Sequence, residues 1–152
     1  MNLDHKDRQL LNLLQQNSKR TTKSLATELS LSVTAVFERI KKLERLEVID
    51  GYVAMVNRKK IDRDFLVICH VKLIQHSKEF ITQFEREISK FPEVLECFHV
   101  SGDYDYILKI IVKDISEYRE FMVSKLTNLQ HIASTQSAFT IKEVKTTTTV
   151  AL

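Results

Sequence analysis

Apolar residues between positions 22 and 46 recur at steps of three and four, in two short patterns separated by a polar hinge at residues 29–32. One helical face of the second pattern carries Val33, Val36, Ile40, Leu43 and Leu46. Ser32 is placed to cap this helix with its hydroxyl. The first pattern has its own apolar stripe, made of Leu25, Ala26 and Leu29. The spacing therefore predicts two helices packed crosswise around a tight turn, a helix-turn-helix.

The opposite face of the second helix is polar and mostly charged. It carries Thr34, Ala35, Glu38, Lys41, Lys42 and Arg45, with Phe37 and Arg39 on its flanks. Such a face can meet a DNA duplex, and the charge balance supports this interpretation. Residues 1–64 hold 13 Lys or Arg against 9 Asp or Glu, whereas residues 65–152 hold 10 against 11. The alternative is an ordinary helical hairpin with a solvated charged face.

The segment before this motif predicts a third helix. Asp4 and Asp7, followed by four leucines, mark a capped amphipathic helix that ends near residues 15–17. Thr21 or Thr22 then caps the next helix, whose free amides lie where a DNA phosphate can sit.

The pattern changes after residue 46. Residues 48–56 have the β-branched and aromatic bias of strands around the turn Asp50-Gly51, which predicts a small wing or a linking strand. Residues 57–64 are charged and poor in apolar side chains. We therefore expect three regions: a helix-turn-helix DNA-binding domain at 1–51, a linking strand and connector at 52–64, and a second domain at 65–152.

From residue 65 the pattern alternates between strands and helices. We expect strands at 65–74, 94–101, 106–112 and 138–144, with helices at 77–91 and 116–129. The order β-α-β-β-α-β predicts a ferredoxin-like sandwich, so the whole chain is α+β with a winged helix-turn-helix first. Both helices then cover one face of the sheet. The bare face, which we expect Phe65, Val67 and Val71 to line, favours burial against a second copy.

Composition narrows the class of protein. With 43% hydrophobic and 28% charged residues, two glycines and one proline, the chain is globular. It has no apolar run of about 18 residues and begins with polar residues, so we expect a cytoplasmic protein with no membrane segment.

The sequence gives little support for a catalytic site or a metal site. Cys69 and Cys97 lie in apolar runs as expected of reduced core thiols, and the five histidines are scattered. His70 and His99 lie beside these cysteines on two strands, as a metal site would need, but we expect alternation to place each His and its neighbouring Cys on opposite faces. The chain contains no phosphate loop or nucleophile elbow. We predict no enzyme, no cofactor and no metal site.

The loop at residues 101–105 has the chemistry of an amino-acid site. Gly102 permits a backbone conformation that exposes amides to a carboxylate, and Asp103 or Asp105 could hold an α-ammonium group. Residues 135–140 supply hydroxyls nearby. The alternative is an ordinary hairpin turn in which Asp caps its own backbone.

Two motifs in this chain resemble signatures of the Lrp/AsnC family of transcription regulators. The first is Leu31, Ser32, Arg39, Ile40, Lys41, Lys42, Leu43 and Glu44, and the second is Gly102, Asp103, Tyr104 and Asp105. The resemblance covers nearly the whole chain. It implies dimers built through the sheet domain, often gathered into octamers of four dimers, and regulation by a small molecule that is usually an amino acid. The chain departs from the family at residues 129–132, which puts the pocket shape and ligand identity in doubt.

These observations predict a sequence-specific DNA-binding regulator that responds to an amino acid. An alternative is an oligomeric amino-acid sensor with low-specificity, architectural DNA binding, and a third possibility is a sensor without DNA function. The predicted DNA-binding residues are Thr22, Ser24, Ser32, Thr34, Ala35, Glu38, Arg39, Lys41 and Lys42. The predicted effector-binding residues are Ser101, Gly102, Asp103, Tyr104, Asp105, Thr135, Ser137 and Thr140. The expected partners are double-stranded DNA, further copies of the chain and the effector.

Overall fold

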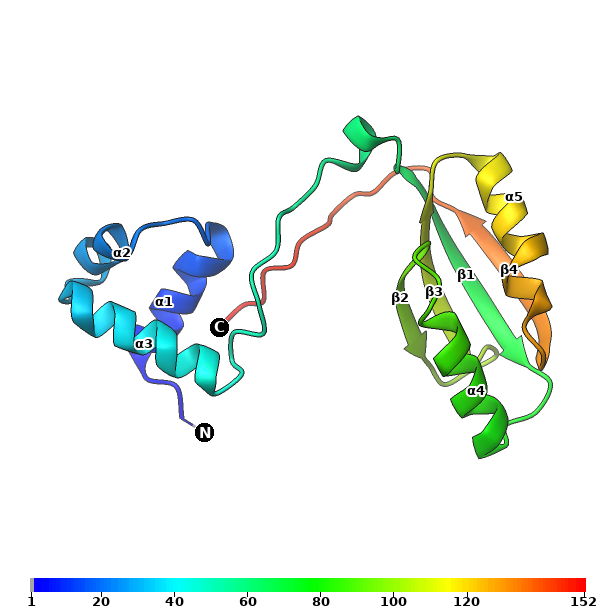
Figure 1. Ribbon diagram of the computed structural model, residues 1–152, viewed down its shortest axis with the longest axis horizontal. Helices are drawn as coiled ribbons and strands as arrows, with labels where there is room; N and C mark the ends of the chain where they lie inside the picture. The colour runs from blue at the N-terminus through cyan, green and yellow to red at the C-terminus, as the bar shows by residue number, and fades with distance from the viewer. Residues whose placement is uncertain (1) are drawn as a thin grey trace. The chain divides into compact units, whose positions relative to one another are not determined.

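A computed structural model describes residues 2–152 (Figure 1). It divides into two compact units, one formed by the residues up to Met55 together with Val144–Leu152, the other by Val56–Glu143. The C-terminal tail returns to the first unit, where the Val150 amide donates to Gln15 Oε1 at 2.7 Å and Gln15 Nε2 donates to the Val150 carbonyl at 3.0 Å. The division predicted from sequence does not include this return. Within residues 2–152, no helix has the length and apolar character needed to cross a membrane.

Three helices build the first unit, and their caps explain where each begins. They are α1 (His5–Gln16), α2 (Thr22–Leu29) and α3 (Val33–Arg45). The side chains of Asp4, Thr21 and Ser32 accept backbone amides in the respective first turns, which confirms the predicted helix starts. Ser30, with φ 53°, makes the turn between α2 and α3. The core is formed by Leu10, Leu11, Leu14, Leu25, Ala26, Leu29, Val36 and Leu43.

Two residues of the predicted apolar stripe are not buried. Val33 is 49% exposed and Leu46 is 42% exposed, because they lie at the two ends of α3, beyond the helices against which it packs. The buried stripe of α3 is therefore shorter than the sequence indicated.

The expected wing is not formed. The amides of Val48 and Ile49 donate back to the carbonyl of Leu43 at 2.9 and 3.3 Å, so this part of the chain completes the end of α3. Residues 50–57 form neither helix nor strand. Among the described residues no second segment pairs with them, and an extended segment without a partner has no ladder hydrogen bonds. The prediction of strands at 48–56 is therefore wrong for this chain.

The second unit is a sheet with two helices on one face (Figure 1). After the short 3-10 helix η1 (Arg58–Ile61), its elements are β1 (Phe65–Leu73), α4 (Lys78–Ile88), β2 (Val94–His99), β3 (Tyr106–Val112), α5 (Ile115–Ser124), the 3-10 helix η2 (Leu126–Asn128) and β4 (Ile132–Phe139). The strand order is β2-β3-β1-β4, and every neighbouring pair is antiparallel. This topology confirms the predicted ferredoxin-like α+β arrangement.

The last strand lies earlier than predicted. We expected it at 138–144, but β4 spans Ile132–Phe139 and pairs with β1 from Leu73 back to Val67. Its residues are mostly small and polar, so its own composition is a weak strand signal, and pairing with β1 determines its position. The helix expected at 116–129 also ends early, at Ser124 in α5, and continues as η2.

The predicted bare face of the sheet was also assigned to the wrong residues. Phe65, Val67 and Val71 pack with the helices, and Val67 and Val71 are fully buried there. The alternate set begins with the apolar Leu66 and Ile68 and continues with His70 and Lys72, so only the second half of β1 indicates which set faces the helices. The other side, here called the open face, is defined by Ile68, His70, Phe98, Ile107 and Ala138.

A buried carboxylate joins α1 to α3. Asp7 is fully buried, and its two oxygens accept from Arg39 Nη1 at 2.6 Å and from Lys42 Nζ at 2.9 Å. Arg39 Nη1 also donates to Asp4 Oδ2 at 2.6 Å, while Asp4 and Asp7 form a capping box. Burial opposes ionisation of Asp7, but the hydrogen bonds from Lys42 and Arg39 outweigh it, so its pKa lies below the usual 3.8.

We expect Asp7→Asn to destabilise the first unit by about 2 kcal/mol, because two cations lose their shared partner. This loss of stability is smaller than that expected for a wholly buried ion pair, since Arg39 and Lys42 are partly exposed and can be hydrated. The pKa of Asp7 is lower in the folded chain, so the stabilisation is present above about pH 4 and is lost as the pH falls further. Urea unfolding followed by helical circular dichroism measures it. Asp50→Asn, at an exposed site, is the control and should change stability by less than about 0.5 kcal/mol; equal stabilities of both variants would contradict the assignment.

Candidate nucleic-acid and effector sites

The exposed surface of α3 is narrower than the sequence suggested. Thr34, Glu38 and Lys41 are exposed, and Ala35 is half-buried. Lys41 Nζ donates to Glu44 Oε2 at 2.8 Å and lies 5.8 Å from the ring centroid of Phe37. Ser32 accepts the Ala35 amide at 3.1 Å, so its hydroxyl is used as the helix cap. This surface can offer a duplex both hydrogen-bonding and apolar groups.

Arg39 and Lys42 lie on the flank that faces α1. Both cations are paired with Asp7, and the pKa of Arg39 is raised by its hydrogen bonds to Asp4 and Asp7. A DNA phosphate would have to compete with a buried carboxylate for them. The structure thus separates these two predicted DNA contacts from Thr34, Glu38 and Lys41.

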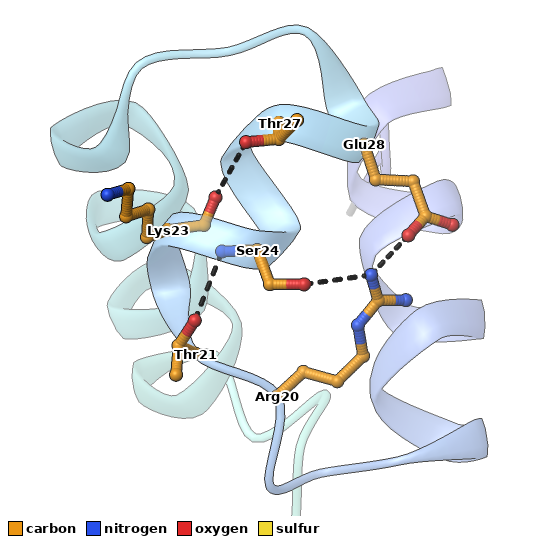
Figure 2. Close-up of a pocket in the computed structure, with 6 residues that line it drawn as sticks. All are labelled: Arg20, Thr21, Lys23, Ser24, Thr27 and Glu28. Atoms are coloured by element: carbon orange, nitrogen blue, oxygen red, sulfur yellow. Dashed lines mark hydrogen bonds and ion pairs between the residues drawn. The ribbon is translucent and has the colours of Figure 1, made fainter.

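A shallow depression lies at the start of α2, with a volume of about 510 Å³ (Figure 2). Its lining consists of Arg20, Thr21, Lys23, Ser24, Thr27 and Glu28. Thr21 Oγ1 accepts the Ser24 amide at 3.1 Å, and Ser24 Oγ accepts from Arg20 Nη2 at 3.1 Å, as Figure 2 shows. Arg20 also pairs with Glu28. Ser24 is exposed and Thr22 is half-buried beside it.

Sequence reasoning missed Arg20 and Lys23 in this depression. Their positions next to the cap residue Thr21 were the available signal, because a helix start and nearby cations both favour an anion.

In the second unit, the loop between β2 and β3 is held by Asp105. Its Oδ2 accepts the Leu73 amide at 2.7 Å, and its Oδ1 lies 2.5 Å from His76 Nε2. Its own amide donates to the Val71 carbonyl at 2.9 Å. Burial acts against the charged form, but the bonds from Leu73 and His76 prevail and lower the pKa of Asp105. This carboxylate is therefore already engaged in fixing the loop to the end of β1.

The rest of the loop is accessible. Ser101, Gly102 and Asp103 are exposed, and Gly102 has φ 128°, a conformation that favours glycine. Asp103 is thus the exposed carboxylate of the loop, while Asp105 is only partly accessible. The hydroxyl of Tyr104 donates to Gln136 Oε1, and its ring centroid lies 5.1 Å from that of His70.

The structure brings only some of the predicted effector residues together. Thr135 and Ser137 pair with helix-facing residues of β1, and Ser137 Oγ lies 2.5 Å from the Tyr118 hydroxyl. Thr140 lies at the opposite end of the sheet from the loop, where its amide donates to the Leu66 carbonyl. Instead, Gln136 and His70 reach Tyr104 on the open face. Strand alternation, with the correct register of β4, would have identified them.

The cysteines do not assemble with the histidines. Cys69 faces the helices and His70 the open face, as expected. Cys97 and His99 are two residues apart and share a face, which corrects the expectation that alternation separates them. Cys69 is buried as a core thiol is expected to be, but Cys97 is exposed, so that expectation is wrong for Cys97. Desolvation of its sulfur and the nearby Glu85 raise the pKa of Cys97 to about 11. No group of three or more His, Cys, Asp or Glu able to hold a metal occurs in the part of the chain that the structure describes.

Two family models match the chain along most of its length. The AsnC-type helix-turn-helix domain matches residues 3–44, and the Lrp/AsnC ligand binding domain matches residues 66–150. The first match contains α1, α2 and all but the last residue of α3, and the second contains the sheet except for the first residue of β1.

Named relatives agree with both matches. The leucine-responsive regulatory protein of Haemophilus influenzae is 37% identical over 150 residues, covering 99% of this chain and 90% of the relative. The Bkd operon transcriptional regulator of Pseudomonas aeruginosa is 32% identical over 142 residues, covering 93% of each.

Solved structures share the fold. An AsnC family transcriptional regulator from Agrobacterium tumefaciens is 34% identical, with a TM-score of 0.93 over 97% of this chain and 96% of that chain. A transcriptional regulator from Neisseria meningitidis, solved as a complex with L-Met, is 28% identical with a TM-score of 0.93, over 98% and 96%. The shared fold, the similarity over nearly full length and the two domain matches together place the chain in the Lrp/AsnC family of transcription regulators.

Proposed function

We propose that this regulator reads DNA with the exposed stripe of α3 and holds the phosphate backbone with the start of α2. One observation carries the proposal: part of the polar face of α3 is accessible and part is not. The accessible residues are Thr34, Glu38 and Lys41. Arg39 and Lys42 are paired with Asp7. Thr34 and Glu38 offer hydrogen-bonding groups to base edges, and Lys41 a cation to a nearby phosphate. Ala35 and the capped start of α3 at Ser32 lie beside them.

Phosphates bind at the α2 depression in this proposal. Ser24 in the depression and Thr22 beside it offer hydroxyls, Lys23 offers a cation, and the helix start favours an anion. Arg39 and Lys42, which the sequence predicted as direct contacts, serve mainly to hold α3 against α1.

We expect Lys41→Ala to weaken binding to every duplex by a similar factor and to reduce the slope of log K against log salt by about one, because one phosphate contact is lost. Fluorescence anisotropy over a series of salt concentrations measures both quantities. Lys78→Ala, an exposed lysine on α4, is the matched control and should change neither.

The same assay separates a specific regulator from the architectural alternative. A specific regulator binds a selected duplex at least about 1000-fold more tightly than a scrambled one. Similar affinities for both duplexes would favour architectural binding, and no binding to either would contradict the proposal as a whole.

We infer that the open face of the sheet joins two copies of the chain. Ile68 and Ile107 lie half-buried on it and Phe98 is 51% exposed, although such a face is usually covered. An interface around a two-fold axis would bury the same residues on both copies. Dimers joined in this way can assemble further into the octamer that the resemblance implies.

We predict a particle of at least twice the 17.7 kDa chain mass in light scattering at micromolar concentration. Ile68→Glu should shift it towards the monomer, because a charge would be buried without a partner. Val123→Glu, at an exposed apolar site on α5, is the control and should leave the mass unchanged. A monomeric wild-type protein, or equal masses for the two variants, would refute the interface.

We propose that an amino acid binds at the loop of residues 101–105. Its carboxylate can meet the amides around Gly102, and Asp103 can hold the ammonium group while Asp105 keeps the loop in place. The L-Met complex of the Neisseria meningitidis regulator supports the class of ligand. Bound ligand should change DNA affinity by a coupling of about 1–3 kcal/mol. The proposal gives the protein no catalytic residue, in keeping with relatives that are transcription regulators.

Screening the twenty amino acids by thermal shift should identify at least one that raises the melting temperature, because a ligand of the folded state stabilises it by mass action. Asp103→Ala should remove this shift and leave the unliganded melting temperature unchanged. Asp105→Ala should lower the unliganded melting temperature as well, since it releases Leu73 and His76. Asp64→Ala, at an exposed site, is the control. If no amino acid shifts the wild type, or if Asp103→Ala keeps the full shift, the loop is a hairpin turn only.

A further inference from the structure

Two apolar side chains interrupt the polar surface of α3. Val33 is 49% exposed and Phe37, one turn later, is 47% exposed. Neither belongs to the cluster of side chains that forms the core of the first unit. Single exposed apolar side chains are common on protein surfaces and need no explanation by themselves. On a helix that is proposed to bind DNA, an exposed aromatic ring is a candidate contact.

The pairing of α3 with α1 determines which way this ring points. Asp7 holds Arg39 and Lys42, so their flank of α3 is turned towards α1. At 100° per residue, Phe37 lies about 160° around the helix from Arg39. Phe37 therefore belongs with the accessible stripe and not with the flank that packs against the unit.

The surroundings of Phe37 suit DNA better than an apolar protein surface. The ammonium of Lys41 lies 5.8 Å from its ring centroid, and the exposed Thr34 and Glu38 are its helical neighbours. A cation beside a small apolar patch complements a groove that is lined by phosphates and contains isolated methyl groups. In the major groove only thymine presents such a group, at C5, and apolar side chains recognise it.

We propose that Phe37, flanked by Val33, contacts the 5-methyl group of thymine and is a specificity-determining residue of this regulator. The inference rests on the proposed DNA binding by α3 and adds the base that is read and the group that reads it. It assigns the base preference to an apolar contact in addition to the polar groups of Thr34 and Glu38.

The test removes the methyl group and nothing else. A duplex is first selected from a random-sequence library with the full-length wild-type protein, and each thymidine is then replaced singly by deoxyuridine, which keeps the same hydrogen-bonding edges. We expect at least one replacement in the site to weaken binding by about four-fold, the effect of removing one methyl group from an apolar contact. Phe37→Ala should bind the two duplexes equally, while Phe37→Leu, which keeps an apolar side chain, should retain most of the difference.

Leu46→Ala is the matched control, because Leu46 is also an exposed apolar residue, 42% accessible, but lies at the far end of α3. It should keep the four-fold ratio. Equal wild-type affinities for all thymidine and deoxyuridine duplexes would overturn the inference, and so would an unchanged ratio in Phe37→Ala, which would show that the methyl group acts elsewhere or through DNA shape. A wild-type protein that selects and binds no duplex would instead overturn the proposed function itself. Phe37 is 47% exposed and lies outside the core of the first unit, so Phe37→Ala should fold, which helical circular dichroism checks before the ratio is measured.

Discussion

The buried carboxylate of Asp7 is the interaction on which the first unit depends. An ionised group without water is costly unless it is paired and hydrogen-bonded, and Asp7 meets this requirement with Arg39, Lys42 and the capping box of α1. The same requirement restricts the two cations. If Arg39 or Lys42 left Asp7 to bind a phosphate, the buried carboxylate would lose a partner and the folded unit would be destabilised. Asp7 thus joins α1 to α3, and in the proposed function the side of α3 away from Arg39 and Lys42 is the one that meets DNA.

The loop of the second unit is built on the same chemistry. Asp105 accepts a hydrogen bond from the Leu73 amide and contacts His76, so it joins the loop that contains Gly102 to the end of β1. Asp105 belongs to a motif that predicts ligand binding, yet it is already bonded within the chain. In the first unit Arg39 and Lys42 belong to such a motif, yet both are paired with Asp7. The groups that we propose for the ligands are exposed neighbours, Asp103 in the loop and Lys41 on α3, whose partner Glu44 lies on the same helix.

Local signals in the sequence were sufficient for the helices and for the order of the strands. Caps such as Asp4 and Ser32 act within three residues, and helical spacing needs no knowledge of the partner. The errors arose where distant residues decide the outcome. Asp7 and Arg39 are 32 residues apart, and β4 acquires its position and face from its register with β1. In β1 the first residues of both alternating sets are apolar, and the set with Phe65, Val67 and Val71 was assigned to the open face although it packs against the helices. Gln136 and His70 escaped notice for the same reason.

The geometry of the second unit bears on how an effector could act. Tyr104 leaves the loop and contacts Gln136 and His70 on the open face, the face that we infer to join two copies. A ligand at the loop would therefore prefer one packing of that face over another, and any such preference must appear equally in the affinity between copies, because linkage is reciprocal. A dimer presents two α3 helices, whose binding to two half-sites is favoured by their high effective concentration. An effector can then change DNA affinity by changing assembly, without altering a single contact that Asp7 holds in place.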